Sequence, residues 1–200
     1  KGWAGPVVYL PSPPLAAIKA RLPDAEVRYL DGSDRDAAAK AAGSADLVVV
    51  FASQWSTEDA DRALSLPDGQ DELIAALAKA NSRVVVVLET GGPVVMPWLD
   101  RVPAVLEAWF PGSGGGEAIA RVLFGEVDAS GRLPVTFPQS LDQLPHPALP
   151  GAETNGRTPF SIAYDEGAAV GYKWFEQTGS TPLFPFGFGL SYGRYDYTDL

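Results

Sequence analysis

The sequence contains no cysteine, and among its 200 residues there is one histidine and one methionine. Without cysteine the chain has neither disulfides nor thiolate metal sites. The only histidine, His146, stands between two prolines and has no second histidine with which to share a metal ion. We therefore expect His146 to be a solvated loop residue, and we expect the chain to use neither a metal ion nor another cofactor.

An excess of basic charge is also missing, since the formal net charge is −10. Nucleic acids and anionic membranes are bound through Lys and Arg patches, so neither is an expected partner. No apolar run reaches membrane-spanning length, and KGWAGPVVYL at the start is too interrupted for a signal peptide's apolar core. We expect a soluble chain. Because it does not begin with methionine, we also expect it to be part of a longer protein.

Short β-branched runs alternate with Ala-rich helical patterns along the first two thirds of the chain. This alternation predicts an α/β fold with a mostly parallel sheet sandwiched between helices. The runs VVVF and VVVVL have no polar alternation, which is typical of central strands covered on both faces. The expected strands are 6–10, 25–30, 45–53, 83–89, 103–110 and 132–137, and the expected helices are 14–22, 35–42, 68–81 and 115–125.

The composition of the sequence changes at Pro138. Beyond it the periodic pattern ends, and Pro, Gly and aromatic residues predominate. We assign residues 1–138 to the α/β sandwich core. Residues 139–200 are predicted to form a long, irregular connector that packs on this core. Its last part, PLFPFGFGLSYGRYDYTDL, alternates aromatic and small residues, and it resembles the entrance to a further β module.

Ligands of open parallel sheets bind at the carboxyl ends of the strands, where three loops are candidates. The glycine-rich loop PGSGGGEAI lacks the Lys and Ser or Thr of a phosphate loop, and Glu117 would repel phosphate. We interpret it as a tight strand-to-helix turn in which Glu117 favours the helix N-terminus. TGGPVVMPW is predicted to form an apolar plug at an interface, around Met96 and Trp98. The third loop is ASQWSTEDADR.

Glu58 in the third loop has two interpretations that the pattern alone leaves open. Ser56 or Thr57 is a suitable N-cap, and Glu58 would then belong to the acidic first turn of a helix. Alternatively, Glu58 is a general acid, because Trp55 is three residues away and an apolar aromatic wall raises the pKa of a carboxyl group.

Several segments together resemble the second domain of family 3 glycoside hydrolases, the β-glucosidase and β-xylosidase family. They occur in the family's order and span most of the chain. Such enzymes consist of a TIM-like barrel, an α/β sandwich and a fibronectin-like β domain, and this chain is similar to the flavodoxin-like sandwich plus the connector. The segments are QWSTEDADRALSLPDGQDELI, VVVVLETGGPVVMPW, VLEAWFPGSGGGEAIARVLFGEVDASGRLPVTFP, YDEGAAVGYKWF and PLFPFGFGLSY.

The resemblance implies a retaining, exo-acting mechanism on terminal β-glucosyl or β-xylosyl residues of oligosaccharides or aryl glycosides. A barrel Asp attacks the anomeric carbon, and a sandwich Glu is the acid/base. That Glu falls on Glu58, which favours the catalytic interpretation, and Asp59 replaces the family's usual Gly. Trp55 is expected to line the outer sugar site, with Gln54 and Asp59 orienting Glu58. The nucleophile lies in the barrel, outside this chain, so the isolated chain is expected to be inactive.

Other hypotheses remain beside this one. Glu166, in YDEGAAVGY, is the second candidate acid, although we favour a structural ion pair for it. A non-catalytic sugar-binding or interdomain scaffold domain is the alternative function, supported by the Gly-to-Asp59 departure. A flavodoxin-like nucleotide binder would rest on fold alone. The family resemblance further implies export to the periplasm or out of the cell.

Overall fold

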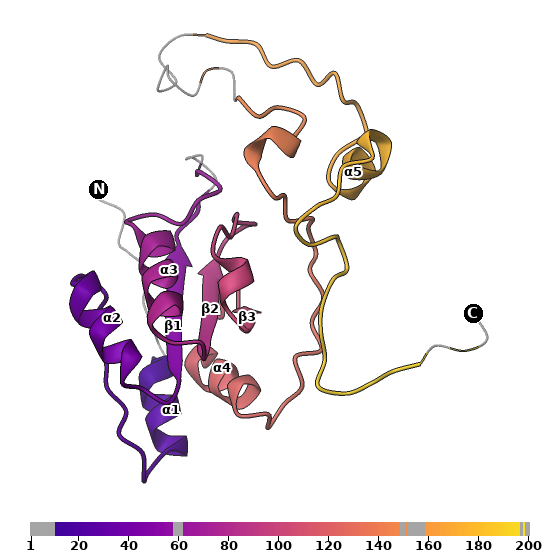
Figure 1. Ribbon diagram of the computed structural model, residues 1–200. Coiled ribbons are helices and arrows are strands. Elements are labelled where there is room, and N and C mark those ends of the chain that lie inside the picture. Colours follow the sequence, from indigo (N-terminus) through magenta and orange to yellow (C-terminus); the bar gives the residue numbers. More distant parts are fainter. Residues whose placement is uncertain (1–10, 58–61, 149–150, 152–158, 197, 199–200) are drawn as a thin grey trace, which may run out of the picture.

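The computed structural model of the protein describes residues 11–57, 62–148, 151, 159–196 and 198. From α2 to α4 its helices and strands alternate as the sequence predicts (Figure 1). In chain order they are α1 (Pro14–Arg21), α2 (Arg35–Gly43), β1 (Val48–Gln54), α3 (Gln70–Ala80), β2 (Val84–Thr90), the 3-10 turn η1 (Leu99–Arg101), β3 (Ala104–Glu107), α4 (Gly115–Leu123), η2 (Leu141–Gln143) and α5 (Tyr172–Thr178).

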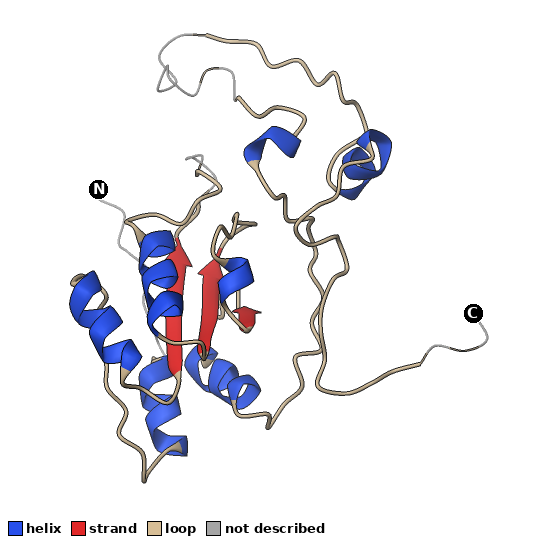
Figure 2. Ribbon diagram, in the orientation of Figure 1, coloured by secondary structure: helices blue, strands red, loops and turns tan. Residues whose placement is uncertain are grey.

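The described sheet is entirely parallel and its strand order is β1-β2-β3 (Figure 2). Val48 pairs with Val84 and Gln54 with Thr90, so β1 and β2 begin and end level with one another. β3 pairs with β2 from Ala104 to Glu107. The predicted α/β fold with a parallel sheet is therefore confirmed.

The helices begin where local chemistry favours a start. Pro14 occupies the first turn of α1, where its missing N–H costs no hydrogen bond. At α2 the side chain of Asp34 accepts a hydrogen bond of 2.9 Å from the backbone N–H of Ala37, which caps the helix. α3 carries Asp71 and Glu72 in its first turn, where negative charge interacts favourably with the helix dipole.

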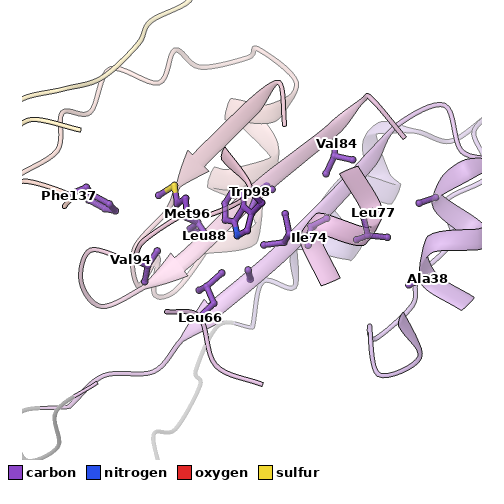
Figure 3. Packing of buried hydrophobic residues seen from close by; sticks show 14 residues of the cluster. Ala38, Leu66, Ile74, Leu77, Val84, Leu88, Val94, Met96, Trp98 and Phe137 are labelled. Atoms are coloured by element: carbon purple, nitrogen blue, oxygen red, sulfur yellow. The ribbon is translucent and has the colours of Figure 1, made fainter. Parts of the chain in front are cut away.

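One face of the sheet is covered by α2 and α3 and holds the larger part of the core (Figure 3). Val86 and Leu88 of β2 are fully buried there, and Ile74 of α3 packs against them. The segment after β2 folds back over the same face and buries Met96 and Trp98. TGGPVVMPW is thus apolar and buried, as predicted, but it belongs to the main core of the domain and not to an interface plug.

The opposite face of the sheet is covered by α1 and α4, which pack against each other. Its buried cluster is small and consists of Ala17, Ile18 and Ala120, with Phe51 of β1 packed against it. Ser12 lies so close to α4 that its carbonyl accepts a hydrogen bond of 3.0 Å from the N–H of Gly116. A Cβ at Gly116 would lie 2.0 Å from that carbonyl oxygen, so only glycine permits this approach.

The structure differs from the sequence-based expectation at two strands. Residues 25–30 form no strand, and Tyr29 in this segment is 68% exposed. A strand needs a ladder partner, and no strand in the described part of the chain pairs with this segment. Residues 132–137 form only an isolated antiparallel bridge, between Phe137 and Phe184. The expected strand 6–10 lies outside the described residues.

The connector is mostly irregular, as predicted, but it contains η2 and α5, which the sequence analysis did not anticipate. It extends away from the sheet and then returns (Figure 1). On its return, Leu183 and Gly187 donate backbone hydrogen bonds of 2.8 Å to Phe137 and Leu133. Asp128 accepts further bonds from the Ser191 hydroxyl and the Tyr192 N–H. Among the described residues, no helix is long and apolar enough to cross a membrane.

Candidate active site at the carboxyl edge of the sheet

The ends of β1, β2 and β3 lie together at one edge of the sheet because the strands are parallel. Gln54 ends β1, Thr90 ends β2 and Glu107 ends β3. Gln54 and Thr90 are paired in register, and Glu107 pairs with Leu88 of β2. This is the edge at which open parallel sheets bind their ligands.

Gln54 is buried and its side chain anchors the loop that follows β1. Its amide nitrogen donates hydrogen bonds of 2.9 Å to the carbonyl of Ala63 and 2.8 Å to that of Ser65. Arg62 donates a further bond of 2.9 Å from Nε to the carbonyl of Trp55. The described start and end of this loop are therefore held together. Glu58 and Asp59, which the sequence analysis placed at the centre of the site, lie outside the described residues.

Trp55 projects from the edge of the sheet and is 60% exposed. Its ring stacks on Phe110 with a centroid separation of 5.6 Å and an angle of 28° between the ring planes. Phe110 follows β3, so the stack joins the loop after β1 to the loop after β3. Together the two rings form an apolar wall at the sheet edge.

Two open pockets lie beside Trp55. The first has a volume of about 340 Å³ and lies on the α1/α4 side of the sheet; it is lined by Ser53, Trp55, Glu89, Phe110, Pro111 and Gly112. The second has a volume of about 290 Å³ and is lined by Gln54, Trp55, Arg62, Ala63, Ser65 and Pro67. Trp55 is common to both pockets.

Glu89 contributes a carboxylate to the first pocket. It is paired in register with Ser53, so both side chains lie on the α1/α4 face of the sheet. Partial burial raises the pKa of Glu89 above its usual value. Within the part of the chain that the structure describes, no residue donates a hydrogen bond to this carboxylate. The strand end beside it is rigid, because Gln70 of α3 exchanges two hydrogen bonds, 2.8 and 2.9 Å long, with the backbone of Ser53.

Glu107 is a second carboxylate at this edge, and it is largely buried. Burial raises its pKa to about 7, although hydrogen bonds from the Trp109 N–H and the Thr90 hydroxyl oppose the shift. The bond from the Trp109 nitrogen is 2.9 Å long. Trp109 has a φ of 54°, which is unfavourable for a tryptophan. Glu107 therefore stabilises the tight turn that leads to Phe110.

Sequence analysis did not single out Glu89, Glu107 or Phe110 as site residues. The available signal was a charged residue directly after an apolar strand, in VVVVLE and AVLE. Such a residue lies at the carboxyl edge of a parallel sheet, where a charge is accessible to a ligand.

The glycine-rich loop before α4 is a tight turn, as predicted. Gly114 has a φ of 77° and caps α4, and Glu117 lies in the first turn of that helix. Arg21 of α1 binds Glu117 at 2.6 Å and Glu126 at 2.5 Å. These contacts hold the pKa of Glu117 below its usual value. The loop therefore connects β3 to α4, and Glu117 is paired with Arg21 of α1 at the start of α4, where a phosphate loop would bind an anion.

Glu166 forms a 2.8 Å interaction with the ring of His146 in the connector. The Glu166 side chain is 6% exposed, and hydrogen bonds from its own backbone N–H and from His146 lower its pKa. A lowered pKa is the opposite of what a general acid needs near neutral pH. Glu166 thus has the structural partner that we favoured for it. His146 lies in a loop, as expected, but it is half-buried and paired with Glu166 instead of being fully solvated.

Comparison with known proteins identifies the family. The model of the glycosyl hydrolase family 3 C-terminal domain matches residues 1–192. The chain belongs to this family. It is 44% identical over 178 residues to thermostable β-glucosidase B of Acetivibrio thermocellus, and 44% identical over 169 residues to a β-glucosidase of Rhizobium radiobacter. These alignments cover 85% and 80% of this chain, but only 23% and 20% of the relatives.

The solved structures that resemble this chain are also β-glucosidases. The chain matches a family 3 β-glucosidase of Neurospora crassa with a TM-score of 0.85 and 30% identity, over 96% of this chain and 24% of that one. It matches a β-glucosidase of Streptomyces venezuelae, solved with D-glucose, with a TM-score of 0.70 and 43% identity, over 79% and 20% of the two chains. The family 3 resemblance seen in the sequence is thereby confirmed, and this chain spans about a fifth to a quarter of each relative's length.

Proposed function

We propose that this chain is the acid/base-bearing α/β domain of a retaining, exo-acting β-glycosidase that removes terminal β-glucosyl or β-xylosyl residues. The observation that carries the proposal is that Gln54 and Arg62 join the two described ends of the loop after β1 at the carboxyl edge of the sheet. Glu58 lies between these two ends in the sequence. The β-glucosidase names of the relatives favour glucosides among the possible substrates.

In this mechanism an Asp of the barrel attacks the anomeric carbon, and the bond to the leaving-group oxygen breaks. Glu58 donates its proton to that oxygen in the first step. It then removes a proton from the water that hydrolyses the covalent glycosyl–enzyme intermediate. The two carboxyl groups of a retaining glycosidase lie roughly 5 Å apart, so the barrel has to dock against this edge of the sheet.

The roles of the neighbouring residues follow from this arrangement. Trp55 lines the outer sugar site, and Gln54 orients Glu58 through its hold on the loop, with Asp59 as a further orienting group. Residues 1–138 form the sandwich, and residues 139–200 lead toward a fibronectin-like β domain. Because the nucleophile belongs to the barrel, the isolated chain has no hydrolytic activity. The complete enzyme is exported and acts on oligosaccharides or aryl glycosides in the periplasm or outside the cell.

The test compares the barrel-containing enzyme with its Glu58→Gln variant on 2,4-dinitrophenyl β-glucoside and on methyl β-glucoside. The methoxide leaving group needs a proton and the dinitrophenolate does not. The variant should therefore lose on the order of 100-fold or more in kcat/KM on the methyl glucoside and little on the aryl glucoside. On the aryl glucoside kcat should nevertheless fall, because hydrolysis of the glycosyl–enzyme intermediate lacks its general base. Azide should restore this kcat and give β-glucosyl azide, since an anion needs no general base.

Glu166→Gln is the matched control, because Glu166 is the other candidate acid and is engaged by His146. It should leave the rates on both glucosides unchanged. Small, equal losses on both substrates for Glu58→Gln would contradict the proposal. Glu58 would then be a helix cap in a sugar-binding or scaffold domain.

A further inference from the structure

We propose that Gly91 is a positioning residue for the acid/base loop, because its missing side chain leaves the space that Ser56 and Phe110 occupy. The inference rests on the proposed function and extends it from Glu58 to the packing that sets where the loop of Glu58 begins. Gly91 directly follows β2, the middle strand of the described sheet, so it lies between the loops that follow β1 and β3.

Three loops meet at Gly91. A Cβ built on this residue would overlap the hydroxyl oxygen of Ser56, which belongs to the loop after β1. The same Cβ would lie 2.9 Å from Cζ of Phe110, which belongs to the loop after β3. Cβ atoms essentially never approach other heavy atoms within 3.0 Å. Any larger residue at this position therefore forces one of the two neighbouring loops to move.

The requirement for glycine comes from these neighbours and not from the backbone. Neither Gly91 nor Gly92 has a positive φ, so neither is in the left-handed conformation that disfavours other residues. A Cβ at Gly92 would meet nothing within 4 Å. The two adjacent glycines thus differ in their surroundings alone, and they form a matched pair for substitution.

Phe110 is held in place and cannot readily move away from an added side chain. The turn before it is fixed by the Trp109 N–H, which donates a hydrogen bond of 2.9 Å to Glu107. The Trp109 ring contacts the fully buried Phe137 with a centroid separation of 6.0 Å. The Phe110 ring itself stacks on Trp55. The loop after β3 is therefore anchored to the main core beside Phe110.

The loop after β1 is the part that yields. Its first anchor is the buried Gln54, whose amide donates two hydrogen bonds to carbonyls at the far end of the loop. Ser56 lies beyond this anchor and is only half-buried. A methyl group at Gly91 therefore displaces Ser56, and Glu58 follows Ser56 by two residues in the sequence.

Such a displacement affects proton transfer more than it affects other steps. A general acid has to lie within hydrogen-bond reach of the leaving-group oxygen. A misplacement of about 1 Å in a catalytic group costs on the order of 100-fold in rate. Gly91 thus acts on catalysis through the loop, without contact with the substrate.

The experiment compares Gly91→Ala with Gly92→Ala in the complete, barrel-containing enzyme, on methyl β-glucoside and 2,4-dinitrophenyl β-glucoside. Gly91→Ala should lose roughly 10- to 100-fold in kcat/KM on the methyl glucoside, whose leaving group needs the proton. On the aryl glucoside it should lose less than about threefold. Gly92→Ala should match wild type on both substrates. The ratio of the two kcat/KM values does not depend on the fraction of folded enzyme, so partial unfolding does not mimic this result.

Two further variants show whether Gly91 acts through Glu58. In the Glu58→Gln background, Gly91→Ala should cause no additional loss on the methyl glucoside, because no acid is left to position. Ser56→Val enlarges the same contact from the opposite side, so it should give the same selective loss as Gly91→Ala. It replaces Gly91→Ala in the comparison if that variant does not fold.

The outcomes separate this inference from the acid/base proposal. If Glu58→Gln is selective but Gly91→Ala and Ser56→Val lose equally on both substrates or not at all, the positioning role is overturned and the acid/base assignment stands. Losses that multiply in the double variant would also overturn it. If Glu58→Gln is not selective but Gly91→Ala is, Glu58 is not the acid, and Gly91 still positions the group that is.

Discussion

The two faces of the sheet are covered in different ways. On the α2/α3 face, large side chains fill the space, and Trp98 and Ile74 are almost completely buried. On the α1/α4 face the buried cluster is small, and the layers are held by close backbone approach at Gly116 and by the ion pairs of Arg21. The first face is a packed core, whereas the second is a thin layer.

The difference accounts for the place of the first pocket. At the carboxyl edge the α2/α3 face is closed by the segment that carries Met96 and Trp98. On the α1/α4 face no comparable segment covers the edge among the described residues, and Ser53 and Glu89 line an open pocket. The first pocket thus opens on the thin face, whereas the described part of the packed face is open only at the second pocket, beside Gln54. The predictions below test this division, beginning with the largest expected effect.

Trp98→Ala should strongly destabilise the packing on the α2/α3 face of the sheet. Trp98 is fully buried and its Nε1 donates a hydrogen bond of 2.7 Å to Asp71, so the change leaves a large cavity and removes a bond. We expect a loss of about 3–5 kcal/mol in the free energy of unfolding, measured by urea denaturation. Trp98→Phe keeps most of the ring and should cost clearly less. Equal effects of the two changes would mean that the hydrogen bond, and not the packing, dominates.

Gly116→Ala should disrupt the close approach of α1 and α4 on the other face of the sheet. The added Cβ would meet the Ser12 carbonyl oxygen at 2.0 Å and the Pro14 nitrogen at 2.6 Å, and both are backbone atoms. α4 then has to move away from α1, at a cost of roughly 2–3 kcal/mol. Gly131→Ala is the matched control, because a Cβ there meets nothing within 4 Å. A neutral Gly116→Ala variant in the same urea experiment would contradict the close approach of these two layers.

Glu107→Gln should change how the stability of the protein depends on pH, because Glu107 is a buried carboxyl group at the carboxyl edge of the sheet. Burial raises the pKa of Glu107 to about 7, so the folded protein retains a proton that the unfolded chain releases at its ordinary pKa of 4.5. The folded state binds more protons between these values, and the free energy of unfolding falls as the pH rises through them. This contribution is complete below the unfolded pKa and is lost above about pH 7.

The measurement is the difference in stability between wild type and Glu107→Gln at several pH values. Glutamine does not titrate, so wild type should lose about 2 kcal/mol relative to the variant between about pH 5 and pH 7. A difference that does not change with pH would show that Glu107 ionises at its ordinary pKa and is well solvated.

Local pattern predicted the buried strands well, because a strand covered on both faces needs an uninterrupted apolar run such as VVVVL. It failed at residues 25–30. Alternating residues can suggest a strand, but the pattern does not show whether a second strand is present to pair with it. The site was predicted only in part. The position of Trp55 at the edge was foreseen from the order of strands and loops. Its stacking on Phe110, and the burial of Glu107 beneath that turn, depend on contacts between distant segments.

The return of the connector has a consequence for how this chain can be varied. The chain leaves the sandwich at Phe137 and comes back at Phe184, where the two residues are bridged. The intervening residues therefore form an excursion whose ends are already adjacent, and such positions tolerate exchange of the chain between them. We expect that segments of different length from other family 3 domains can be placed between these two phenylalanines while the sheet is retained. Phe137 and Phe184 are therefore suitable junctions for chimeric proteins.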